Sequence, residues 1–315
     1  MWQRNKIWLI RVFSFLKLKQ LELFNSQALG ELFFPEGLDY AQNKATCISL
    51  KHGRSIAIQK DAFEWILIKG GGWTWGGPLV YRSVKDEQLV FGLYSTQDAI
   101  REIAVSRKLE EISDNFPKVL YYKSFKDYML PDEFDFLHNT VYSDNTPVNP
   151  CLLYTQVKSP LRIADLQFLN DNEKQEVLTF YSSYFKSPQA QFVEIFAEKL
   201  GEHIGLMHMN NFINDSLDND NITLAAEITD YEWVTAPGIP FPDGSYGDII
   251  PNERKEKEIL YALEAVLFLS SILRFKIGFY EIFECLIQGY RKSNASFITH
   301  NENINKIIAR AKYII

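Results

Sequence analysis

The sequence predicts an α+β fold in which a strand-rich amino-terminal half precedes a helix-rich carboxy-terminal half. Short apolar runs of β-like character dominate the chain as far as residue 157. From residue 158 onward, apolar residues recur at helical spacing over long segments. A glycine-rich segment directly follows an apolar strand in the first half. We therefore expect an extension at residues 1–30, an amino-terminal lobe at 31–157 and a helical lobe at 158–315.

Length, charge and cysteine content narrow the class of protein. A chain of 315 residues with 46% hydrophobic residues can bury a large core, as one domain or as two lobes. The net charge of −7 predicts no general basic surface, so we do not expect nucleic acid as a partner. Cys47, Cys151 and Cys285 fit neither a disulfide framework nor a zinc spacing. From this cysteine pattern we expect a reducing cytoplasm, and no apolar run has transmembrane length.

The first 19 residues combine five basic side chains with many apolar ones and contain no acid. Such a segment could lie on an anionic membrane surface as an amphipathic helix, or could resemble an import signal. The apolar residues of segment 1–19 would surround a helix and would not form a single stripe. We therefore favour packing of this segment along its own domain, with membrane contact as the alternative.

The predicted strands of the first half lead into the glycine-rich segment. Residues 46–50, 55–58 and 64–69 are typical of antiparallel strands, and the last of them ends at Lys69. Five glycines follow within residues 70–77. Glycines allow the backbone to approach a ligand closely and to direct several N–H groups at one anion. The segment is therefore a candidate phosphate loop with Lys69 as its counter-charge, although a flexible turn is the simpler alternative.

A helix and two further strands complete the expected amino-terminal lobe. Ser95 and Asp98 have the spacing of a capping box, which predicts a helix at residues 99–112. Glu102 lies near the start of this helix, from where it could reach back and orient Lys69. The next strands are predicted at residues 118–125 and 151–157, joined by a long polar connection.

Helical periodicity covers most of the second half. The sequence predicts helices at these positions: 170–185, 188–207, 252–275, 278–291 and 301–313.

Between the second and third of these helices lies a polar stretch centred on Asp220, Asn221 and Asp230. The apolar residues between Asn221 and Asp230 predict a short strand, a turn and a second short strand. Such a ribbon would place an amide oxygen and a carboxylate side by side, which suits Mg²⁺. Asp220 would then be a candidate catalytic base. The alternative is an ordinary solvent loop, because Asn and Asp are common in turns.

Several short motifs follow one another along the chain: Gly53-Arg54-Ser55, Ile68-Lys69-Gly70-Gly71-Gly72-x-Thr74, Ile100-Arg101-Glu102, Thr155-x-Val157, Ser159-x-x-Arg162, Asp220-Asn221 and Asp230-Tyr231. In this order they resemble the motifs of the selenoprotein O (SelO, also called YdiU) family. That family has a two-lobed protein-kinase-like fold and transfers AMP from ATP to protein hydroxyl groups. Together they cover roughly residues 50–235, and the nine-position spacing from Asn221 to Asp230 is the same in the family.

The resemblance implies a role for each matching residue. Asp220 would be the base, while Asn221 and Asp230 would hold Mg²⁺ (or Mn²⁺). ATP would be the co-substrate, bound between the two lobes, and proteins would receive AMP on Ser, Thr or Tyr. The nucleotide-binding positions would be Arg54, Lys69, Gly70, Gly71, Gly72, Glu102 and Arg162.

The sequence also departs from the family pattern. Gln156 stands where the family has arginine, and Glu232-Trp233 replaces a Gly-Pro. The chain is also much shorter than a typical member. Two alternatives therefore stay open: a kinase that transfers the γ-phosphoryl group, and a catalytically weak pseudokinase that binds nucleotide for regulation.

Overall fold

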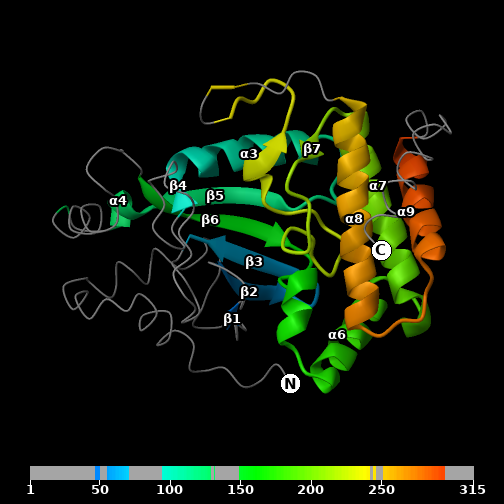
Figure 1. Ribbon diagram of the computed structural model, residues 1–315. Coiled ribbons are helices and arrows are strands. Elements are labelled where there is room, and N and C mark those ends of the chain that lie inside the picture. The colour runs from blue at the N-terminus through cyan, green and yellow to red at the C-terminus, as the bar shows by residue number, and fades with distance from the viewer. Residues whose placement is uncertain are drawn as a thin grey trace, which may run out of the picture. The chain divides into compact units, whose positions relative to one another are not determined.

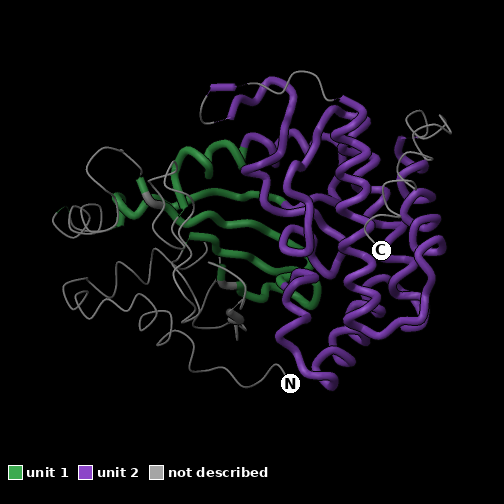
Figure 2. The backbone as a smooth tube through the Cα atoms, viewed as in Figure 1, with its two compact units in different colours: residues 1–103, 118–160 green, residues 104–117, 161–315 purple. Residues whose placement is uncertain are grey.

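The computed structural model describes residues 47–49, 55–70, 94–128, 131, 149–241, 244–245 and 251–294. Within the chain, two compact units are distinguished (Figure 2). Unit 1 comprises residues 1–103 and 118–160, and unit 2 comprises 104–117 and 161–315. The predicted lobe boundary was at 157/158, with residues 104–117 in the first lobe. The predicted extension at 1–30 lies outside the described residues.

Unit 1 contains an antiparallel sheet in the order β1-β2-β3-β6-β4, with β5 also paired to β6. Strand β3 is apolar and almost entirely buried, as expected for a run without polar alternation. Three strands pair with β6, which makes it the centre of this sheet (Figure 1). The strands are β1 (Cys47–Ser49), β2 (Ser55–Asp61), β3 (Glu64–Lys69), β4 (Tyr94–Ser95), β5 (Lys118–Ser124) and β6 (Pro150–Val157).

Helix α3 (Thr96–Glu110) starts in unit 1 and continues into unit 2, and the short helix α4 (Phe125–Tyr128) follows β5. Ser95 caps α3, because its hydroxyl accepts the backbone N–H of Asp98 at 3.0 Å. The same hydroxyl donates to the Asp98 carboxylate at 2.5 Å. The predicted cap is therefore present, and it fixes where the helix carrying Glu102 begins.

Unit 2 is built mainly from helices, with one two-stranded ribbon of β7 and β8. Its long helices are α6 (Asp171–Tyr184), α7 (Phe192–Met209), α8 (Asn252–Ile272) and α9 (Phe279–Ser293). Its shorter elements are the 3-10 turns η2 (Ile163–Phe168), η3 (Gln189–Gln191) and η4 (Tyr231–Trp233), and the strands β7 (Ile213–Asn214) and β8 (Val234–Thr235).

Helices α7, α8 and α9 lie side by side and form the core of unit 2 (Figure 1). Helices α7 and α9 approach so closely that glycine is required at the contact. A Cβ atom on Gly201 would lie 2.0 Å from the carbonyl oxygen of Leu286, and one on Gly289 would lie 1.8 Å from that of Glu198. This contact fixes α7, and therefore the polar stretch that follows it.

The elements predicted from the sequence agree with the structure to within a few residues, and the mixture of strands and helices is confirmed. The largest shift is at residues 188–191, which precede α7 and include the separate turn η3. The predicted helix at 301–313 lies outside the described residues. None of the described helices has the length and apolar character needed to cross a membrane.

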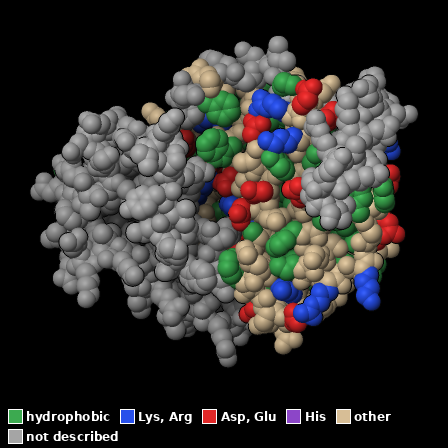
Figure 3. Space-filling model, in the orientation of Figure 1, with side chains coloured by type: hydrophobic (Ala, Val, Ile, Leu, Met, Phe, Trp, Pro, Cys, Tyr) green, Lys and Arg blue, Asp and Glu red, His purple; other side chains and the backbone are tan. Residues whose placement is uncertain are grey.

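Charged side chains of both signs are mixed on the described surface that faces the viewer in Figure 3. On this face, lysine and arginine lie among aspartate and glutamate and do not form one basic field.

Candidate functional site

The candidate residues of unit 1 centre on a buried ion pair between Lys69 and Glu102. The register of β3 places Lys69 at the end of the strand, opposite Leu153 of β6. The Lys69 Nζ atom donates to Glu102 Oε1 at 2.8 Å, and only 8% and 4% of the two side chains are exposed. The pairing expected from the sequence is therefore present. Removing two charges from water is costly, so such a pair is better explained by function than by stability.

Tyr94 completes this arrangement. Its hydroxyl donates to the same Glu102 oxygen, and its ring lies 4.3 Å from Lys69 Nζ. The glutamate thus accepts two donors, and the lysine has both a carboxylate and an aromatic face beside it. Sequence reasoning did not identify Tyr94. The antiparallel pairing of β4 with β6 brings it to the pair, and no local motif signals that pairing.

Gly70 is the first glycine of the predicted phosphate loop. Its φ of +96° is a conformation that favours glycine. A Cβ atom there would lie 2.5 Å from the carbonyl oxygen of Cys151. Both observations explain why glycine follows Lys69 directly. Gly71, Gly72 and Arg54 lie outside the described residues, so their phosphate-binding role stays a prediction.

In unit 2, the stretch from Asn221 to Asp230 forms the narrow ribbon that the sequence predicts. The backbone N–H of Thr229 donates to the carbonyl oxygen of Asn221 at 2.9 Å, and Ile222 and Ile228 form an isolated bridge. Asn221 therefore lies opposite Thr229, the immediate neighbour of Asp230. The ribbon is held by single bridges and is shorter than two regular strands.

Two residues of this ribbon have left-handed backbone conformations. The φ of Ala226 is 59° and that of Asp230 is 60°. Non-glycine residues adopt this region at a cost, and they cluster where a site requires a particular geometry. The buried His203 of α7 contacts the carbonyl oxygen of Ala226 through Nδ1 at 2.8 Å. A carbonyl only accepts, so Nδ1 carries the proton, and helix α7 anchors the turn.

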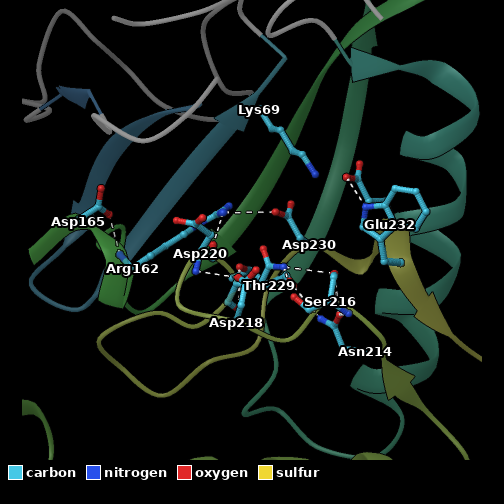
Figure 4. Close-up of polar contacts among 12 residues, drawn as sticks. Lys69, Arg162, Asp165, Asn214, Ser216, Asp218, Asp220, Thr229, Asp230 and Glu232 are labelled. Atoms are coloured by element: carbon cyan, nitrogen blue, oxygen red, sulfur yellow. Dashed lines mark hydrogen bonds and ion pairs between the residues drawn. The ribbon is translucent and has the colours of Figure 1, made fainter. Parts of the chain in front are cut away.

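Arg162 links the two ends of the ribbon (Figure 4). Its Nη1 atom donates to the carbonyl oxygen of Asp220 and lies 3.3 Å from the Asp230 carboxylate. Its Nε atom is buried without a hydrogen-bond partner in the described part of the chain. This guanidinium is therefore set beside a carboxylate, and contact with a phosphate remains the prediction for it.

The amide of Asn221 has a defined orientation. Its Nδ2 donates to the carbonyl oxygen of Ser216 at 2.6 Å, which turns Oδ1 to the opposite side. Among the described residues, none donates a hydrogen bond to that Oδ1. An amide oxygen and a carboxylate suit Mg²⁺, which takes few protein ligands beside phosphate oxygens. Asn221 and Asp230 therefore fit the predicted ion chemically.

A larger all-protein metal cluster is absent from the part of the chain that the structure describes. No group of three or more His, Cys, Asp or Glu side chains there could hold a metal ion. The predicted site has only two protein ligands, one asparagine and one aspartate. The absence of a larger cluster therefore does not bear on it. Any ion held there would need ligands from the nucleotide as well.

Asp220, the predicted base, is exposed, and its carboxylate forms no hydrogen bond or ion pair with a described residue. Its backbone N–H donates to Asp218 Oδ1 at 2.9 Å. Partial burial raises the pKa of Asp218, and the charges of Asp220 and Asp230 raise it further. The Asp220 N–H and Arg162 act in the opposite direction. Asp218 and Asp220 both have exposed side chains.

Comparison with protein-family models and with curated proteins finds no significant match to this chain.

Proposed function

We propose that this chain is a Mg²⁺-dependent, ATP-using transferase of the SelO type, with a protein-kinase-like arrangement of two lobes. It would transfer AMP from ATP to Ser, Thr or Tyr hydroxyls of other proteins. The observation that carries the proposal is the buried pair of Lys69 and Glu102 at 2.8 Å. The sequence resemblance assigns these positions to nucleotide binding, and a glycine with positive φ follows the lysine directly.

In the proposed reaction, the substrate hydroxyl oxygen attacks the α-phosphorus of ATP. A new phosphorus–oxygen bond forms, the bond to the bridging oxygen breaks, and pyrophosphate leaves. Asp220 takes the hydroxyl proton, and the cations of Lys69 and Arg162 compensate phosphate charge. Mg²⁺, held by Asn221 and Asp230, would add positive charge at the phosphates. Catalysis of this kind depends mainly on positioning and electrostatic stabilisation.

The proposal includes a reducing cytoplasmic location. Cys151 and Cys285 are free thiols, and burial raises the pKa of Cys151 to about 12. Such a thiol is inert at neutral pH and has no evident redox role. Protein substrates, ATP and the divalent ion are the partners that the proposal requires.

Isotope position tests the reaction. The purified protein is incubated with Mg²⁺ and ATP labelled at either the α- or the γ-phosphorus, with itself and a protein mixture as acceptors. Label from the α-position on protein, with the mass of one adenylyl group, is the expected result. Label from the γ-position alone would instead establish a kinase. Absence of both labels, together with normal ATP binding, would establish the regulatory pseudokinase.

Variants tie the activity to the site. Asp230→Ala removes a proposed metal ligand, and we expect labelling to fall about 100-fold or more. Lys69→Met should have an effect of similar size. Lys123→Met is the matched control, because Lys123 is an equally buried lysine of the same unit, on β5. Full turnover by Asp230→Ala would contradict the assignment of the site.

A further inference from the structure

A chain of buried polar side chains runs through unit 2 and has no part in the proposed reaction. It connects Tyr290 on α9, His208 on α7 and Glu258 on α8, all at most 2% exposed. The His208 Nδ1 atom lies 2.8 Å from the Tyr290 hydroxyl, and Nε2 lies 2.7 Å from Glu258 Oε2. The second Glu258 oxygen accepts the backbone N–H of Asn214 at 2.9 Å. Buried polar groups are expensive, so a connected set of this length requires an explanation.

The donor directions along this chain are mutually consistent. Burial, together with the nearby charge of Glu258, raises the pKa of Tyr290, so its hydroxyl keeps its proton. That hydroxyl accepts from Asn294 Nδ2 at 3.3 Å and lies 2.8 Å from His208 Nδ1, to which it can donate. The proton of the histidine ring then lies on Nε2 and is donated to Glu258. Each group has a partner, and Glu258 accepts from both sides, from the histidine ring and from the N–H of Asn214.

Asn214 connects this chain of hydrogen bonds to the ribbon (Figure 4). Its Oδ1 accepts both the backbone N–H and the hydroxyl of Ser216 at 3.1 Å, and its Nδ2 donates to the carbonyl oxygen of Thr229 at 3.3 Å. Ser216 in turn accepts from Asn221 Nδ2 through its carbonyl oxygen at 2.6 Å and its hydroxyl at 3.3 Å. Thr229 Oγ1 donates to the carbonyl oxygen of Asn221 at 3.2 Å. Asn214 therefore holds both sides of the ribbon.

We propose that Glu258, Asn214 and Ser216 are positioning residues that fix the amide of Asn221 with its oxygen toward the metal ion. This inference rests on the proposed function, because it gives Asn221 the role of a ligand. An asparagine amide can turn by half a rotation and exchange its oxygen for its nitrogen. The Ser216 carbonyl opposes the exchange, since a carbonyl oxygen can only accept. The Ser216 hydroxyl accepts from the same Nδ2 and donates to Asn214 Oδ1, so it keeps this carbonyl in place, and it is the group that Ser216→Ala removes. The buried chain holds Ser216 in place, as outer partners do at metal sites.

The experiment measures ATP affinity by calorimetry, once with Mn²⁺ and once with EDTA. The ratio of the two dissociation constants is the gain in affinity due to the metal. For Ser216→Ala and Glu258→Gln, we expect this ratio to fall about tenfold, the lower end of the range for outer-shell changes. The dissociation constant in EDTA should stay unchanged, because the residues of unit 1 are intact. A general loss of structure would instead weaken both measurements.

Two further variants make the result decisive. Asn221→Ala sets the largest loss that the network could cause. Ser182→Ala is the matched control, because it removes a buried hydroxyl of unit 2 that has no hydrogen-bond partner in the described structure. Its ratio should equal that of the wild-type protein. Should Glu258→Gln fail to fold, Ser216→Ala, on a half-buried side chain, carries the test alone.

The possible outcomes distinguish a failure of this inference from a failure of the proposed function on which it rests. A loss with Asn221→Ala but none with Ser216→Ala and Glu258→Gln would overturn the inference alone. A wild-type ratio of one would show that no metal assists ATP binding. That result would overturn the proposed function and, with it, the role given to this network.

Discussion

At the scale of single residues, burial makes Lys69 and Glu102 depend on each other. Loss of one partner leaves the other charge buried without its counter-ion, which costs about 3–5 kcal/mol. We expect Lys69→Met and Glu102→Gln each to lower the free energy of unfolding by roughly that amount. The double variant should lose less than the sum of the two, because no uncompensated charge remains. Urea unfolding of the four proteins measures this.

The double variant also separates stability from chemistry. It should fold nearly as well as the wild-type protein and yet transfer no nucleotide, because the lysine that compensates phosphate charge is gone. Normal labelling by the double variant would show that the pair is purely structural. Additive losses of stability would show that the two charges do not interact.

His203 predicts a dependence of stability on pH. Burial lowers the pKa of His203 below its ordinary 6.5, although its bond to Ala226 and the charge of Glu202 oppose this. Below pH 6.5 the unfolded chain therefore binds a proton that the folded protein does not. The contribution of His203 is complete above that pH and is lost as the pH falls below it.

The variant His203→Asn tests the predicted direction of this pH dependence. Its Nδ2 can replace the ring Nδ1 as donor to Ala226, but the amide cannot be protonated. Urea titrations at pH 7.5 and at pH 5.5 give the free energy of unfolding at each pH. We expect this free energy to fall less between the two pH values in the variant than in the wild-type protein. Equal losses in the two proteins would assign the pH effect to other groups.

Some of these residue contacts could be predicted and others could not. The pairing of Lys69 with Glu102 followed from the family resemblance and from the position of the glutamate near a helix start. Tyr94 and Glu258 gave no such signal, because strand register and helix packing bring them to their partners. Arg162 was expected at a phosphate, and its contact with Asp230 depends on how the ribbon folds back.

At the scale of elements, the close crossing of α7 and α9 predicts that even one added methyl group at the contact lowers the stability of the protein. Gly289→Ala would place a methyl group against the backbone of α7, at 1.8 Å from the carbonyl oxygen of Glu198. Overpacking of this kind costs about 1–3 kcal/mol, more than the gain of under 1 kcal/mol from replacing a helical glycine. We therefore expect a net loss of stability, measured by thermal unfolding.

Gly278→Ala is the control for this prediction. A Cβ atom there meets only the carboxylate of Glu281 at 3.4 Å, the end of a flexible side chain. It should cost at most about 1 kcal/mol, through the weaker helix cap. A Gly289→Ala protein as stable as this control would show that the helices can separate without penalty.

The boundaries of most elements could be predicted because they depend on local signals. Ser95 and Asn170 mark helix starts with hydrogen bonds to residues three positions later, and the apolar strand β3 ends at Lys69, directly before a glycine. The glycine contact between α7 and α9 could not be predicted in this way. From sequence alone, a glycine inside a helix suggests that the helix is less stable. Here glycine instead allows the backbones of α7 and α9 to approach each other closely.

At the scale of the whole molecule, the sequence suggested two lobes from the change in periodicity near residue 158, and the structure has a division after Pro160. The inclusion of residues 104–117 in unit 2 was not foreseen. Helix α3 is one continuous helix by every local signal, and only tertiary contacts distribute its residues between the units. Local pattern cannot reveal a division of that kind.

The proposed function assigns both Lys69 and Asn221 to the binding of Mg²⁺-ATP, and this gives a prediction for the whole chain. A ligand that binds only the folded state at 100 times its dissociation constant stabilises it by about 2.7 kcal/mol. We expect Mg²⁺-ATP to raise the unfolding temperature of the wild-type protein, and Lys69→Met or Asn221→Ala each to remove most of that increase. The variant carrying both substitutions should show little further loss, since each single substitution already removes most of the increase. Two independent sites would instead leave part of the increase in each single variant and abolish it only in the double variant.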